Sequence, residues 1–307
     1  MKISSLKYYA AAVLAMLFWG LSFVWFKIVI KYYEPITIIF IRLVISGTLL
    51  LLFLWITGKF ERIRRKDIKW FLALAFTQPL CYFMGESFGL KLVSPTFASV
   101  IISTIPVFSP LVAYYTIREK FSGYSLAGII ISFAGVLIMI LRRDLSFNAA
   151  PAGIALLFFA VLSALFYAVI IRKFSFGYSP LTIITAQNVI GMFYFLPFFL
   201  VMDFSHFMTV RPTFELISAM LQLAVFASIF AYMLYIVVLQ KFGVTRANIF
   251  TNLIPIFTAI ASWMILGEVL TIAKLAGMVI VIMGVVISQW KELRRIFFGG
   301  ESKVIEI

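Results

Sequence analysis

The sequence contains one of its own segments twice, and this repeat limits how the chain can fold. Residues 93–140 match residues 242–289 in constant register, and a weaker match relates residues 34–37 to residues 179–182. The matching pairs include Pro106 with Pro255, Phe108 with Phe257, Glu119 with Glu268, Gly128 with Gly277 and Gly135 with Gly284. The chain is therefore predicted to consist of two related halves.

Long apolar stretches occupy most of both halves. Hydrophobic residues make up 64% of the chain and charged residues 12%, a composition unlike that of a soluble domain. The stretches are about 18–25 residues long, which is enough to cross a hydrocarbon layer of roughly 30 Å as α-helices. The pattern lacks the short alternating segments of a membrane β-barrel. The predicted spans are 8–30, 35–57, 68–89, 95–117, 124–141, 151–171, 180–202, 214–238, 244–266 and 271–290.

The expected fold is an all-α integral membrane protein with ten transmembrane helices in two inverted five-helix repeats. The first repeat is placed at residues 1–145 and the second at residues 146–307, which include a short C-terminal tail. Because each half holds an odd number of spans, the second half enters the membrane in the opposite direction. Inverted repeats of this kind recur in secondary transporters.

The basic residues are distributed unevenly between the two predicted membrane faces. The net charge is +14, and 18 of the 26 Lys and Arg residues fall in segments on the side of the N-terminus, against seven on the other side. This asymmetry predicts that both termini are cytoplasmic. The cluster of Arg62, Arg64, Arg65 and Lys66 is thus interpreted as a topology determinant, with contact to anionic lipid left open. Nucleic-acid binding is not expected.

The motifs of soluble enzymes are missing or out of context. Residues 85–89 match the pattern G-x-S-x-G, but they end a predicted helix, and the only histidine, His206, lies in a predicted outer loop. Cys81 is the only cysteine, so neither a disulfide within the chain nor a cysteine metal cluster is predicted. We expect no enzymatic activity, no cofactor and no metal.

Several motifs together resemble a known family. Gly267, Glu268, Thr271, Gly277 and Gly284 look like the end of an EamA repeat, in the company of Trp19-Gly20, Arg42 and the two prolines. The chain resembles the EamA group of the drug/metabolite transporter superfamily over nearly its whole length. It departs from the pattern where Arg118-Glu119 replaces Gly-Glu and where Ala164-Leu165 stands in place of Trp-Gly.

The resemblance implies a function and a location. It implies a helix bundle with a central cavity that moves small metabolites such as amino acids, often outward, across a bacterial cytoplasmic membrane. Two alternatives stay open: a lipid-linked carrier translocase of the same superfamily, and a membrane scaffold or receptor that transports nothing. The oligomeric state, monomer or homodimer, is also open.

Pro106 and Pro255 lie in corresponding positions of spans 4 and 9. A proline removes one backbone hydrogen bond and bends the helix. The pair is interpreted either as hinges beside a substrate cavity or as static kinks.

Three charges, Lys27, Arg42 and Glu86, lie at similar predicted depth near the outer face. A buried charge must be paired or reach water. We expect Glu86 to face Arg42 or Lys27 in an outer-gate ion pair. A role in substrate binding or protonation, and snorkelling to the interface, are the alternatives.

Two further groups are interpreted as structural. Glu119 and Glu268 precede spans 5 and 10, where a carboxylate can accept from free N–H groups at a helix start. The glycines Gly128, Gly135, Gly277 and Gly284 recur every seven residues and permit close helix contact, within the bundle or at a dimer seam.

Polar side chains at membrane depth are the candidates for a substrate site. Asn and Gln are costly in lipid and must face protein or water, which also draws attention to Gln187, Asn188, Asn248 and Tyr235. The residues chosen as substrate-binding are Trp19, Gln78, Tyr82, Glu86, Tyr167, Gln222, Tyr232 and Asn252. Hydrogen bonding between helices without a ligand is the alternative for each.

Overall fold

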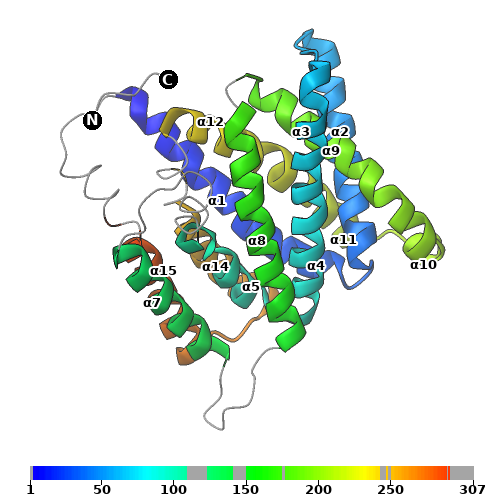
Figure 1. Ribbon diagram of the computed structural model, residues 1–307. Helices are drawn as coiled ribbons and strands as arrows, with labels where there is room; N and C mark the ends of the chain where they lie inside the picture. The colour runs from blue at the N-terminus through cyan, green and yellow to red at the C-terminus, as the bar shows by residue number, and fades with distance from the viewer. Residues whose placement is uncertain are drawn as a thin grey trace.

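The computed structural model is a bundle of helices (Figure 1). The structure describes residues 3–108, 123–140, 150–174, 177–242, 247, 250–288 and 290. No strand occurs in these residues, so the prediction of an all-helical protein is confirmed for them. Three residues singled out in the sequence lie outside the described residues: Arg118, Glu119 and Asn248. Arg118 and Glu119 form the departure from the EamA pattern in the first repeat.

The α-helices follow the apolar stretches of the sequence. They are α1 (Ile3–Val29), α2 (Pro35–Thr57), α3 (Ile68–Ala75), α4 (Tyr82–Leu92), α5 (Pro95–Ile102), α7 (Gly123–Ile140), α8 (Pro151–Phe174), α9 (Pro180–Phe198), α10 (Phe204–Thr209), α11 (Phe214–Gln222), α12 (Ala231–Phe242), α14 (Leu253–Leu266) and α15 (Ile272–Ser288). Wider π-helical turns join some of them: η2 (Phe76–Cys81), η3 (Phe199–Asp203) and η4 (Leu223–Phe230). Short 3₁₀ turns, η1 (Arg65–Asp67) and η5 (Phe250–Asn252), precede α3 and α14.

Within the described residues, five helical segments are long and apolar enough to cross a membrane. They are Lys7–Val29, Pro35–Thr57, Pro151–Ile171, Pro180–Thr209 and Phe214–Phe242. Shorter apolar helices occupy Pro95–Phe108, Gly123–Met139, Phe250–Leu266 and Ile272–Ser288. The chain is thus a multi-pass membrane protein, and the count of ten spans and the inverted repeat stay predictions.

Proline and glycine set several helix ends. Pro35, Pro95 and Pro180 stand in the first turns of α2, α5 and α9, where proline's missing N–H has no partner to lose. Gly58 and Gly267 end α2 and α14 at φ values of 63° and 65°, in the left-handed region that glycine tolerates best. These ends fix where the connections between spans begin.

Helices α7 and α15 pack closely on one another at one side of the bundle (Figure 1). Their glycines face the opposite backbone. A Cβ atom on Gly128 would lie 2.5 Å from the carbonyl oxygen of Gly284, and one on Gly277 would lie 2.7 Å from that of Gly135. Such contacts leave no room for a side chain, so the glycines allow the two backbones to approach.

Helices α2 and α9 form another close pair, and each receives a carboxylate at its start. Asp203, in the turn after α9, accepts from the backbone N–H and the hydroxyl of Thr37 at 3.1 and 2.9 Å. Glu61, in the connection after α2, accepts from the backbone N–H of Ser179 at 3.0 Å and the hydroxyl of Thr182 at 2.8 Å. One backbone N–H at each helix start is thereby satisfied from beyond the far end of the partner helix.

Candidate functional site

The segment around Gln78 departs from helical geometry inside a predicted span. Gln78 has φ −148° and ψ 116°, and Pro79 follows it without an N–H group. The predicted span 68–89 is thus interrupted at Gln78, between α3 and α4, and its crossing of the membrane stays a prediction. Backbone groups freed at such a break must find other partners in the absence of water. The Nε2 atom of Gln187 donates to the carbonyl oxygen of Gln78 at 3.0 Å and supplies one of them.

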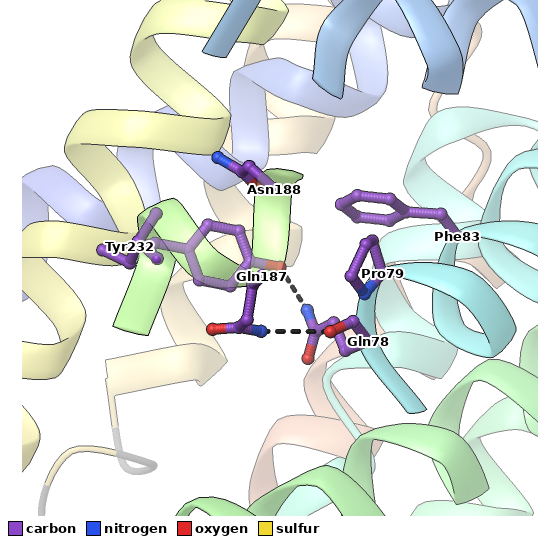
Figure 2. Close-up of a pocket in the computed structure, with 7 residues that line it drawn as sticks. Gln78, Pro79, Phe83, Gln187, Asn188 and Tyr232 are labelled. Carbon is purple, nitrogen blue, oxygen red and sulfur yellow. Dashed lines mark hydrogen bonds between the residues drawn. The ribbon is translucent and has the colours of Figure 1, made fainter. Parts of the chain in front are cut away.

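A small buried pocket surrounds this break (Figure 2). Side chains from four elements converge on it: η2 and α4 supply one wall, α9 a second and α12 a third. Its lining residues are Gln78, Pro79, Phe83, Ile184, Gln187, Asn188 and Tyr232. The Nε2 atom of Gln78 donates to the hydroxyl of Tyr232, and this bond closes the pocket on one side. The free space is about that of one water molecule.

One polar group in this pocket lacks a protein partner. Among the described residues, the Nδ2 atom of Asn188 finds no hydrogen-bond partner, although the residue is only 7% exposed. In Figure 2 the Asn188 amide lies on the side of the pocket away from the bonded Gln187–Gln78 pair. Buried polar atoms are nearly always hydrogen-bonded, and each exception calls for an explanation such as water or a ligand. Asn188 therefore makes this pocket the candidate site.

Arg42 and Glu86 lie beside the pocket without pairing to one another. The Nε atom of Arg42 donates to the hydroxyl of Ser228, and the guanidinium lies 4.4 Å from the centre of the Phe83 ring. The hydroxyl of Tyr82 donates to Glu86 at 2.8 Å. Neither Arg42 nor Lys27 forms an ion pair with Glu86 in the described part of the chain. The expected outer-gate ion pair is thus not formed, because Arg42 is held instead by Ser228 and Phe83.

Lys27 contacts a backbone carbonyl rather than Glu86. Its ammonium group donates to the backbone carbonyl of Lys91 at 3.4 Å, while Lys91 itself pairs with Glu34 at 2.5 Å. Arg42 and Glu86 are still near enough for electrostatic attraction. The geometry therefore separates Lys27 from the two charges beside the pocket.

Most of the other predicted substrate residues gather around Tyr232. Trp19 packs on the rings of Tyr232 and Tyr235, with centroids 5.1 and 5.0 Å apart. The hydroxyl of Tyr167 donates to Gln187 at 3.2 Å. Tyr167 thus positions the Gln187 amide, which in turn bonds the Gln78 carbonyl. Trp19 packs against Tyr232, which lies on the opposite wall of the pocket.

Two predicted residues lie elsewhere. Gln222 on α11 donates to Ser218 at 3.1 Å and does not line the pocket. Asn252, in η5, lies outside the pocket lining, and its Oδ1 atom is buried without a partner. Phe83, Ser228 and Pro79 were not predicted as site residues. Pro79 carried a usable signal, since a proline inside an apolar span interrupts the helix.

The two paired prolines stand just after irregular turns. Pro106 follows a turn at Ser103 and Thr104, and Pro255 follows the 3₁₀ turn η5. The hydroxyls of Ser103 and Thr104 donate to carbonyl oxygens three residues earlier, at 2.7 and 2.6 Å. Both helices are therefore interrupted at corresponding points, and a hinge function stays a prediction.

Glu268 binds a helix start, though not the one that follows it. Its Oε2 atom accepts from the hydroxyls of Thr96 and Ser262 at 2.8 and 2.5 Å, and Thr96 lies in the first turn of α5. Its Oε1 atom pairs with Lys274 at 2.8 Å. Burial works to raise the pKa of Glu268, but Lys274 and the hydroxyl donors outweigh it and lower the pKa below the ordinary value. The carboxylate thus ties α5 to the connection between α14 and α15.

A bundle of apolar helices around a buried polar pocket is compatible with a membrane transporter. Comparisons with known proteins agree with this class. The model of the EamA-like transporter family matches residues 6–141 and 151–290, so the chain belongs to that family.

Relatives in other organisms extend the likeness over almost the whole chain. An uncharacterized transporter of Archaeoglobus fulgidus is 29% identical over 282 residues, covering 92% of this chain and 98% of the relative. The uncharacterized transporter YcxC of Bacillus subtilis is 29% identical over 289 residues, covering 91% of each. A solved crystal structure superposes with a TM-score of 0.68 at 14% identity, covering 92% of this chain and 98% of that one, which concerns the fold alone.

Proposed function

We propose that this protein is a secondary transporter that exports a small polar metabolite across a bacterial inner membrane. The observation that carries the proposal is the pocket at Gln78, where side chains of both halves of the chain converge on an unpartnered amide of Asn188. A polar site buried within an apolar helix bundle matches a substrate site near the membrane midplane. A substrate acceptor group would satisfy Asn188.

The neighbouring charges favour a zwitterionic substrate such as an amino acid. Arg42 uses its Nε atom on Ser228, and a guanidinium has four further N–H donors with the planar geometry that suits a carboxylate. Glu86 receives one hydrogen bond, from Tyr82, and can accept from an ammonium group. A substrate carboxylate would accept hydrogen bonds from the remaining N–H donors of Arg42. A substrate ammonium group would donate to Glu86.

Transport by alternating access is supported by the small size of the pocket. Space for about one water molecule does not admit a metabolite, so helices must separate for binding. The interruptions before Pro106 and Pro255 are suitable points for that movement. A carboxylate that follows α9 binds the start of α2, and a carboxylate that follows α2 binds the start of α9. This reciprocal arrangement also fits two halves related as an inverted repeat.

The test is uptake of labelled amino acids into proteoliposomes, with and without a pH gradient. We expect saturable uptake by the wild-type protein and at least tenfold loss in Arg42→Gln and Glu86→Gln, which corresponds to about 1.4 kcal/mol or more. Gln222→Ala is the matched control, because Gln222 lies away from the pocket. A dependence on the gradient that disappears in Glu86→Gln would assign proton coupling to that residue.

Two outcomes would count against parts of this proposal. Uptake that is unchanged in both charge variants would remove Arg42 and Glu86 from the substrate site. An absence of uptake of any amino acid by folded wild-type protein would reject the amino-acid class and return attention to other metabolites.

A further inference from the structure

The connection between α2 and α3, residues 58–67, has two distinct sides. One side is fastened to the start of α9 through Glu61, as described above, and through Tyr178. The hydroxyl of Tyr178 donates to Asp67 at 2.6 Å, and the Nε atom of Arg64 donates to Asp67 at 2.7 Å. The hydrogen bond from Tyr178 lowers the pKa of Asp67 and so favours the charged carboxylate that Arg64 and Tyr178 bind. These hydrogen bonds therefore fix the connection against the start of α9.

The other side presents cations that the protein leaves unpaired. Five basic residues of this region are exposed, and no described carboxylate lies within ion-pair distance of any of them. They are Lys59, Arg62, Arg65, Lys66 and Lys69. Arg64, by contrast, is engaged with Asp67 and Tyr178. These five cations lie within eleven residues and have no ion-pair partner in the described part of the chain, although Lys69 also lies over the Trp70 ring, and they form a concentrated positive surface.

Large apolar side chains flank these cations. Trp55 is 79% exposed, Ile56 75% and Phe60 71%, and Ile68 at the start of α3 is also exposed. Residues of this kind at the end of a membrane helix lie at the level of the lipid headgroups, with their rings toward the acyl chains. The surface therefore combines positive charge with apolar groups at the height where a phospholipid offers a phosphate above its tails.

We propose that residues 55–69 form a binding site for an anionic phospholipid, with Arg62, Arg65 and Lys66 contacting the headgroup and Trp55 and Phe60 the adjoining acyl region. Phosphate is the complementary ligand, because guanidinium groups bind its oxygens in pairs and clustered cations attract anionic leaflets. The membrane is the source of this phosphate, since α2, which ends at this surface, is long and apolar enough to cross it.

The site is connected to the substrate pocket through α9. Glu61 holds the first turn of α9, and the same helix carries Gln187 and Asn188 about two turns further on. A bound headgroup that steadies residues 58–67 therefore also steadies the start of α9. Occupancy of the lipid site is expected to limit fraying at residues 179–183.

Binding is tested on the full-length protein by titrating phosphatidylglycerol and counting retained lipids by native mass spectrometry. Each cation near an anionic surface contributes about fivefold in affinity, so Arg62→Gln/Arg65→Gln/Lys66→Gln should weaken binding on the order of 100-fold. The matched control is Arg62→Lys/Arg65→Lys/Lys66→Arg, which keeps the charges. Arg65→Gln alone should weaken binding about fivefold if the triple variant does not fold. Unchanged affinity in the neutral variants would overturn the site.

The connection to α9 is tested separately by hydrogen exchange at residues 179–183. In phosphatidylcholine vesicles, added phosphatidylglycerol should slow exchange there in the wild-type protein and not in Glu61→Ala, which still binds the lipid. Exchange that phosphatidylglycerol leaves unchanged in the wild-type protein would reject the connection while leaving the binding site intact. Neither readout depends on transport activity.

Discussion

Asp203 binds the first turn of α2 through both the backbone N–H and the hydroxyl of Thr37, and both residues are buried. The counterpart at the other end of the pair is Glu61, which binds the first turn of α9. Each of the two helices thus depends on a carboxylate that follows the other. Because α2 carries Arg42 and α9 carries Gln187 and Asn188, these contacts fix the relative height of the residues around the pocket.

Replacing Asp203 by alanine is expected to destabilise the protein by about 1–3 kcal/mol, because the N–H and hydroxyl of Thr37 lose a charged acceptor in a buried place. Thermal unfolding in detergent measures the change. Asp203→Asn, which keeps one acceptor oxygen, should lose less. His206→Ala, on the exposed helix α10, is the control. An Asp203→Ala protein as stable as the wild type would show that water replaces the carboxylate without cost.

The contact between α7 and α15 predicts a different kind of sensitivity. A methyl group added at Gly284 would lie 2.3 Å from the Ser132 hydroxyl oxygen and 2.6 Å from its backbone nitrogen. Because backbone cannot rotate away, Gly284→Ala should cost about 1–3 kcal/mol of stability. Gly123→Ala is the matched control, since no atom of the described residues lies within 4 Å of the added atom there. Equal stability of the two variants would mean that α7 and α15 separate easily.

Most helix positions could be predicted from sequence, but most of the side-chain contacts between helices could not. Apolar length and proline placement are local properties, so α2, α5 and α9 begin close to where the sequence predicts. The bond of Gln187 to the Gln78 carbonyl joins residues 109 positions apart and depends on how α9 is rotated against η2. The partners of Arg42 were missed for the same reason, because Ser228 gives no sequence signal that distinguishes it from other serines in apolar spans.

Acid should weaken the link that Glu268 makes between α5, α14 and α15. Its pKa in the folded protein is lowered from the ordinary 4.5, so its stabilising contribution is complete above that value. The contribution is lost as pH falls through the lowered folded-state pKa, when Glu268 takes up a proton and releases Lys274. Melting temperatures measured from neutral pH downward should therefore fall less steeply in Glu268→Gln, which starts lower at neutral pH. Parallel curves for the two proteins would assign the acid sensitivity to other carboxylates.

Substitution of Asn188 can distinguish a role in ligand binding from a role in packing. Its Nδ2 atom has no partner among the described residues, and a buried donor without a partner forfeits about 1–3 kcal/mol of solvation. Replacement by leucine, which is similar in size and apolar, should therefore raise the melting temperature while reducing transport at least tenfold. Gln187→Leu, which breaks the bond to the Gln78 carbonyl, should instead lower the melting temperature. Measured side by side in detergent and in proteoliposomes, the two variants distinguish a ligand-binding amide from a structural one. If Asn188→Leu were both less stable and fully active, Asn188 would serve the fold and the substrate would bind elsewhere.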